Sequence, residues 1–218
     1  MASVLKVDKL DPQSGTALEI GTSGDTITVP SGATFAVSGT MNASSITAGT
    51  LAIAQGGTGA ATLAAAGLSN APAFEAYLSS TQDIGDSVNT RVEINTELVD
   101  TDGCYDNSTN YRFTPTTAGK YFAYFTVIGF TSGAGYDDIL YIAPEIKKNG
   151  TRYVHSLQDI DNSAGERQQS VTTQAIIDMN GSSDYLDYFC EINAASGTGT
   201  LRGDESKTRA GAFLLIGV

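Results

Sequence analysis

Paired acidic side chains and a single histidine are the residues of this 218-residue sequence that could do chemistry. Two neighbouring carboxylates can supply the acid and the base of glycoside hydrolysis. The sequence brings carboxylates together at Asp137–Asp138, at Asp159 and Asp161, and at Asp204–Glu205. A Ser-His-Asp arrangement would have to use His155, which lies in an ordinary polar-edged segment. Because acidic clusters are usually solvated turns, we expect no catalytic residues and no enzyme activity.

Two of the acidic segments, 131–138 and 158–163, also carry groups that suit a saccharide. An aromatic ring stacks on a sugar, and carboxylates and amides form hydrogen bonds with its hydroxyl groups. The alternative is that both loops are solvated turns without a ligand. We predict no cofactor. One alternative stays open: in an assembly of several chains, the acidic loops of the different copies together could bind a divalent cation. The predicted binding residues are Tyr136, Asp137, Asp138, Asp159 and Asp161.

Charge, cysteine content and glycine motifs exclude several other classes of function. A net charge of −12 and a pI near 4.3 would repel a phosphate backbone, so nucleic acid is not an expected partner. No apolar run approaches membrane-spanning length, and no membrane insertion is predicted. Cys104 and Cys190 are expected to be free, partly buried thiols, with one disulfide as the alternative. The tripeptide Arg202-Gly203-Asp204 is interpreted as a chance match to an integrin ligand.

The distribution of aromatic residues divides the chain near residue 70. Of the 18 Tyr and Phe residues, all but Phe35 lie at or after Phe74. The stretch from 10 to 90 contains no Lys or Arg. The elements that would position a binding site therefore belong to the second part of the chain.

Residues 1–50 are rich in Gly, Ser, Thr and Ala, with too few large side chains to form a core. Apolar residues two apart, each followed by turn residues, predict very short strands at 18–21, 27–32 and 35–39. Such strands bury little alone and are stabilised by stacking, for example against identical neighbours around an axis. We therefore predict an N-terminal attachment and shaft segment, with a flexible linker as the alternative.

Residues 51–70 form a predicted joint between the shaft and the second part. The run Gln55-Gly56-Gly57-Thr58-Gly59-Ala60 lacks the Lys and Ser/Thr of a phosphate-binding loop. Thr62 is a possible N-cap for one short helix that ends at Gly67. The run from 51 to 68 resembles the Gly-Gly-Thr-Gly-Ala element of bacteriophage tail-fibre proteins. The segment 31–40 is also similar to their shaft sequences.

Residues 71–218 are predicted to form an all-β head. The segment Lys120–Phe130 is apolar on both alternating faces, which indicates a strand covered by an opposing sheet and by a neighbouring subunit. Several strands in this length favour a two-sheet sandwich or jelly roll. Further strands are expected at 139–146, 169–179, 185–192 and 212–218, with a turn at Asn149-Gly150. The predicted homotrimer interface includes Tyr121, Phe122, Tyr124, Phe125 and Phe130.

The head also resembles the globular domain of complement-type proteins, which share the jelly roll of tumour necrosis factor and trimerise. The best local match is Tyr105-Asp106, Phe113-Thr114-Pro115 and Gly119-Lys120-Tyr121, followed by the long aromatic strand. The sequence departs from the family pattern at Asn110, where glycine is usual, and at Ala123, where an aromatic residue is expected. The resemblance covers roughly residues 74–218 and implies a trimeric jelly-roll head. With the thin β-rich shaft and the Gly-rich joint expected before it, the predicted fold class is all-β.

Together these features predict a virion fibre or receptor-binding protein, assembled in the host cytoplasm and displayed outside it on the particle. Its mechanism would be adhesion: a homotrimer presents three weak sites to a host surface glycan or protein, and avidity supplies the affinity. The N-terminal segment would contact other virion structural proteins. The alternative is a capsid decoration, or cement, protein that stabilises the shell.

Overall fold

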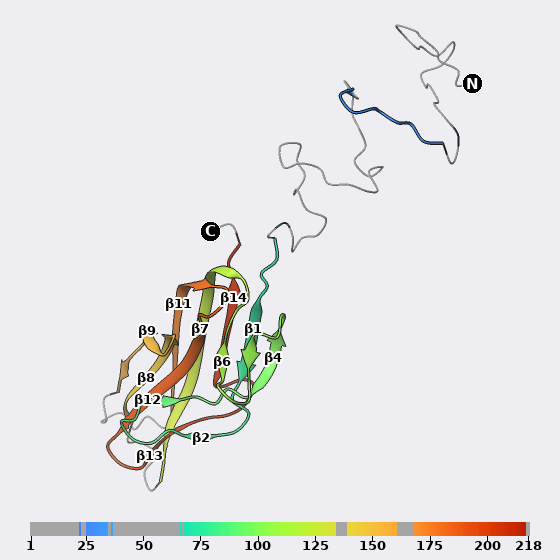
Figure 1. The fold of residues 1–218 in the computed structure, drawn as a ribbon. Helices are drawn as coiled ribbons and strands as arrows, with labels where there is room; N and C mark the ends of the chain where they lie inside the picture. The colour runs from blue at the N-terminus through green and yellow to red at the C-terminus, as the bar shows by residue number, and fades with distance from the viewer. Residues whose placement is uncertain are drawn as a thin grey trace, which may run out of the picture. The chain divides into compact units, whose positions relative to one another are not determined.

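The computed structural model describes residues 22, 25–34, 36, 66, 68–133, 139–160 and 168–216 (Figure 1). The chain divides into two compact units, Met1–Gly49 and Thr50–Val218. Among the described residues, no helix is long and apolar enough to cross a membrane. Most of the predicted joint, including the short helix expected at 62–67, lies outside the described residues.

The first unit is described mainly over residues 25–34. The backbone N–H of Ala33 donates to the carbonyl of Pro30 at 3.0 Å, which closes a turn through Gly32, whose φ is +85°. The predicted turn is therefore present, but residues 25–34 form no strand within the single chain. Ile27 and Val29 are exposed. The strands expected at 18–21 and 35–39 lie outside the described residues, apart from residue 36.

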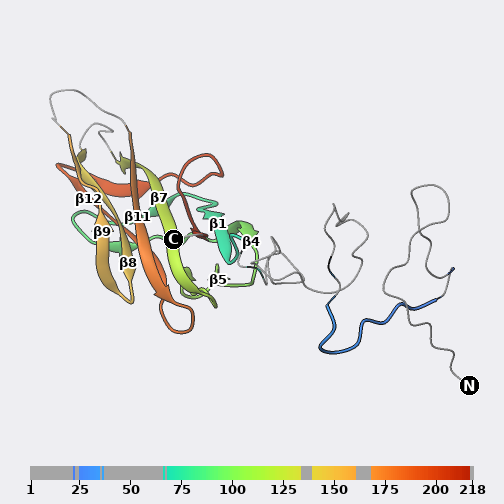
Figure 2. The same cartoon turned by 90° about the horizontal axis from the view of Figure 1, so that it is seen from above.

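The second unit is built from two antiparallel sheets of seven strands each. Figure 2, seen from above, separates the layer that contains β7, β11 and β1 from the layer that contains β8, β9 and β12. Sheet A consists of β1 (Ala73–Tyr77), β2 (Gln82–Asp83), β4 (Thr96–Asp100), β7 (Ala118–Ser132), β11 (Gln169–Asn180), β13 (Thr198–Leu201) and β14 (Arg209–Leu214). Sheet B consists of β3 (Thr90–Arg91), β5 (Tyr105–Asp106), β6 (Arg112–Phe113), β8 (Ile139–Lys148), β9 (Thr151–His155), β10 (Gln158–Asp159) and β12 (Leu186–Ala194).

The long strands form where the sequence alternates between apolar and polar residues or runs apolar on both faces. β7 is the centre of sheet A: it pairs with β11 along one edge and with β14 and β13 along the other. In sheet B, β12 pairs with β8 over most of its length. The β8–β9 hairpin turns at Asn149 and Gly150, whose φ angles of +53° and +74° are those of the predicted Asn-Gly turn. The all-β prediction is confirmed for the described residues.

The core lies between the sheets and is rich in aromatic rings. Phe74 of β1 stacks on Tyr105 at 4.4 Å and on Phe113 at 4.8 Å between ring centroids. The Tyr105 hydroxyl is buried and donates a hydrogen bond to the carbonyl of Ile94 at 2.8 Å. Most buried polar groups in proteins are hydrogen-bonded, and this bond ties the segment before β4 to the core.

Successive side chains of β7 point to opposite faces of sheet A. Tyr121 and Phe125 are fully buried in the core. The prediction that these two belong to the trimer interface is therefore wrong, because side chains alternate along a strand and theirs face the opposing sheet. Phe122 and Tyr124 lie on the outer face. Phe130 lies on the same side by alternation, and the Arg202 guanidinium stacks over its ring at 4.2 Å.

Candidate functional site

The outer face of sheet A carries a row of apolar side chains that no other described element covers. The cross-strand register places Ala73 opposite Phe213, Phe213 opposite Phe122, and Phe122 opposite Ile176. We call these four residues the apolar row. Ile176 is 55% exposed, although isoleucine is among the residues most often buried in proteins. Ala73, Phe122 and Phe213 are half-buried. A partly exposed apolar row that runs across four strands is typical of a surface that contacts another molecule.

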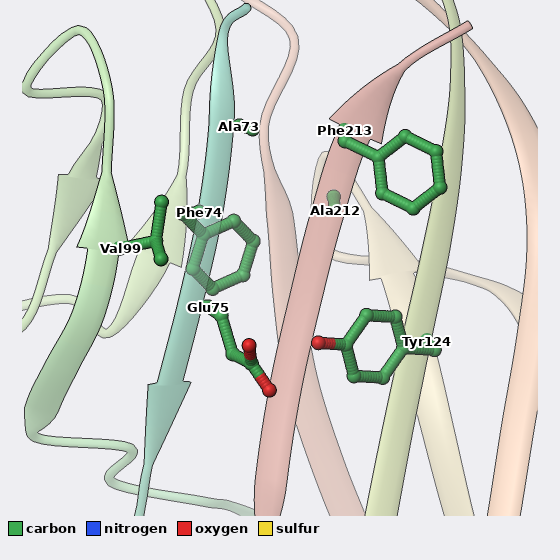
Figure 3. A pocket seen from close by; sticks show the side chains of 7 residues that line it. All are labelled: Ala73, Phe74, Glu75, Val99, Tyr124, Ala212 and Phe213. Carbon is green, nitrogen blue, oxygen red and sulfur yellow. The ribbon is translucent and has the colours of Figure 1, made fainter. Parts of the chain in front are cut away.

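A pocket of about 290 Å³ opens beside the apolar row, between β4, β1 and β14 (Figure 3). The side chain of Tyr124 crosses the strand β14 toward Glu75. Gly211 makes this possible, because a Cβ at that position would lie 2.5 Å from the end of the Tyr124 ring. The pocket is lined by Ala73, Phe74, Glu75, Val99, Tyr124, Ala212 and Phe213.

Polar groups border the pocket on the side away from the apolar row. Glu75 forms an ion pair with Arg209. Burial, together with the negative charge of Glu75, raises the pKa of Tyr124 to about 12, so its hydroxyl stays protonated and can donate a hydrogen bond. The face thus combines an apolar band with an adjacent hydrogen-bonding group, the composition expected of a protein–protein contact.

The predicted saccharide site lies mostly outside the described residues. Tyr136, Asp137, Asp138 and Asp161 belong to the segments 134–138 and 161–167, so their part in a site stays a prediction. Asp159 is described: it is exposed in β10, opposite Tyr141 of β8. The described residues that flank both segments lie at the end of the sandwich opposite the start of β1 (Figure 1).

The other residues that could take part in chemistry do not gather into a site within the described part of the chain. His155 is exposed in β9. Cys104 and Cys190 are both free and buried, and burial raises the pKa of the Cys190 thiol. Arg202 is held over Phe130, and its neighbour Gly203 lies so close to Ser80 that a Cβ there would meet the backbone at 2.2 Å. Within the described part of the chain, no three His, Cys, Asp or Glu residues gather as metal ligands.

The sequence did not identify Ala73, Ile176, Phe213 or Glu75 as site residues. The alternation of 169–179 did contain the signal for Ile176. The buried positions of that segment are apolar except for Thr173, and Ile176 is the apolar exception on the exposed face. The remaining three become site residues only through the pairing of β1, β14 and β7.

Comparisons with known proteins support the fold. No protein-family model matches the chain, and no curated protein matches it. The chain is similar to Eiger TNF from S. frugiperda, with a TM-score of 0.50 and 9% identity, covering 67% of this chain and 93% of that one. It is also similar to the globular domain of zebrafish complement 1qA, with a TM-score of 0.47 and 16% identity over 66% and 97% of the two chains. Murine APRIL gives a TM-score of 0.47 and 12% identity over 66% and 98%.

At these identities the likeness is one of fold. The second unit is a jelly roll similar in fold to that of Eiger TNF. That confirms the all-β jelly-roll head predicted from the sequence, whereas the trimer and the shaft stay predictions.

Proposed function

We propose that this chain is a homotrimeric virion fibre protein whose jelly-roll head attaches the particle to a host surface. The observation that carries the proposal is the apolar row of Ala73, Phe122, Ile176 and Phe213, which is left open on sheet A. Two further copies of the same chain would cover it, because a rotation axis along this face brings identical apolar rows together.

The position of the apolar row agrees with a fibre. It lies at the end of sheet A where β1 begins and β14 ends. Three heads joined there would bring their N-terminal segments to one end of the assembly and leave the opposite loop end for contact with a host. The tail-fibre-like sequences of residues 31–40 and 51–68 support the same arrangement.

Gold labelling of the full-length chain on particles, followed by electron microscopy, tests the proposal. We expect the label on projecting fibres, and we expect purified full-length chain to block particle adsorption to susceptible cells. Label distributed over the shell, with adsorption unaffected by the purified chain, would overturn the proposal and favour the capsid decoration alternative.

A further inference from the structure

The outer face of sheet B concentrates positive charge in an otherwise acidic protein. The register pairs Arg112 with Asp187, Asp187 with Lys147, and Lys147 with Arg152. In the next row, Arg91 is opposite Phe189, which is opposite Glu145. We call the charged members of the two rows the cationic patch: Arg91, Arg112, Glu145, Lys147, Arg152 and Asp187. It holds four cations and two carboxylates, whereas the whole chain has a net charge of −12.

The carboxylates of the patch lie beneath its cations. The side chains of Asp187 and Glu145 are only 3% and 2% exposed, whereas those of Arg91 and Arg152 are 36% and 54% exposed. A molecule that approaches this face therefore meets N–H groups and not carboxylate oxygens. The exposed cations, Arg91 and Arg152, are the part of the patch that an external molecule meets first, whereas the Lys147 side chain is only 16% exposed.

Buried Glu145 holds two of the cations in place. Lys147 Nζ lies 3.0 Å from a Glu145 oxygen, and Arg152 forms a second ion pair with the same carboxylate. Burial opposes ionisation of Glu145, but the hydrogen bonds from Lys147 and Arg152 prevail and lower its pKa. Lys147 is also fixed over the Phe189 ring, 3.5 Å from its centroid, and by Asn89, whose side-chain oxygen accepts a hydrogen bond at 2.8 Å.

Arg112 and Arg91 are the cations with unused donors. The Arg112 guanidinium stacks over the Tyr185 ring at 4.1 Å, and its Nε is buried without a hydrogen-bond partner. Its charge acts on Asp187, which lies opposite it in the register, but the two form no hydrogen bond or close ion pair. Arg91 lies 3.6 Å from Asp187, which is an ion-pair distance and too long for a hydrogen bond. Because the Nε atoms of both arginines are buried, their Nη groups are the donors left for an external oxyanion, which a guanidinium positioned by stacking can bind through two parallel N–H groups.

We propose that the cationic patch binds the carboxylate or phosphate groups of an anionic polysaccharide. The inference rests on the proposed function and names the class of host-surface ligand. The acidic remainder of the chain would repel the dense charge of a nucleic acid, whereas a saccharide chain with spaced charges can place one oxyanion on the patch. Three copies in a trimer would bind one polymer with higher avidity than a single head.

Binding of the purified full-length chain to defined polymers tests the inference. The probes are polygalacturonate, which carries carboxylates, a phosphomannan, which carries phosphates, and uncharged dextran, all measured by biolayer interferometry. Wild-type protein should bind one or both anionic polymers and not dextran, and binding should weaken as salt is raised. Which of the two anionic polymers binds identifies the oxyanion. Binding to neither overturns the proposal.

Matched charge variants locate the site. Arg112→Gln should weaken binding of the anionic polymer by about tenfold, because a charge-assisted hydrogen bond to the ligand is lost. Lys207→Gln removes the same charge from an exposed lysine that pairs with Asp204 outside the patch, and it should change affinity by less than about twofold. Equal weakening by both variants would show a nonspecific charge effect and refute the site.

Two controls separate the possible failures. If Arg112→Gln lowers the melting temperature, Arg152→Gln replaces it, because Glu145 then keeps its partner Lys147; this variant should also weaken polymer binding. If Arg112→Gln loses polymer binding but still blocks adsorption, the patch does not bind the host-surface ligand, and this inference alone is overturned. Polymer binding that persists while the purified chain fails to block adsorption would instead overturn the proposed function.

Discussion

Replacing Ile176 with aspartate should separate the trimer into single chains. Ile176 is 55% exposed at the end of the apolar row, opposite Phe122, so the single chain needs little of its side chain for folding. In a trimer joined through this face, the exposed half of the side chain is buried. An aspartate there would place a charge in each apolar contact.

The size of the effect follows from the exposed area. Full burial of an isoleucine side chain contributes about 1.5–3 kcal/mol, so burial of the exposed half contributes roughly 1–1.5 kcal/mol per chain. Three copies contribute roughly 3–4.5 kcal/mol, which corresponds to a change in the trimer association constant of on the order of 10²–10³. The cost of removing three carboxylates from water adds to this value.

Sedimentation equilibrium over a range of concentrations measures the effect, with Val88→Asp as the matched control. Val88 is 54% exposed, in the loop between β2 and β3 and outside the apolar row. Ile176→Asp should dissociate at concentrations where Val88→Asp and the wild type remain assembled, with all three equally stable as folded heads. Equal association by the two variants would refute burial of the apolar row.

Three further predictions concern the head itself. Phe74→Ala, which removes the ring stacked on Tyr105 and Phe113, should lower the free energy of unfolding by about 3–5 kcal/mol in urea titrations; a loss below about 1 kcal/mol would contradict the packing. Backbone N–H groups, that of Thr109 foremost, lower the pKa of Asp106, so its stabilisation is complete above the ordinary value of 3.8 and is lost as the pH falls through the lower folded-state pKa. The difference in unfolding free energy between wild type and Asp106→Asn should therefore shrink from pH 6 toward pH 2, and a constant difference would refute it. A chain that starts at Ser69 should unfold cooperatively, as followed by circular dichroism, because the aromatic core lies entirely after that point; a noncooperative transition would contradict this division.

The long strands were predictable because each carries its own periodic signal. β7, β8, β11 and β12 alternate or run apolar over nine residues or more, and the Asn-Gly turn marks the β8–β9 hairpin. The two-residue strands β2, β3, β5, β6 and β10 contain no such period. Their pairing is set by the neighbouring strand, so sequence alone could not define them.

The site was less predictable than the fold, because the two proposed contact surfaces, the apolar row and the cationic patch, depend on the register of strand pairing. Tyr121 and Phe122 are of similar character, and only the position of the opposing sheet decides that the first is buried and the second faces outward. The cationic patch joins residues as distant in sequence as Arg91 and Asp187. The charges of the cationic patch come together because β3, β6 and β8 pair with β12, and no local sequence motif predicts that pairing.

Assembly of three chains through the outer face of sheet A is tested most directly by the molar mass of the purified full-length chain. Light scattering coupled to size-exclusion chromatography at micromolar concentration measures it without reference to shape. We expect three times the chain mass of 22.6 kDa. A well-folded protein with the mass of one chain would contradict the trimer and, with it, the proposed fibre.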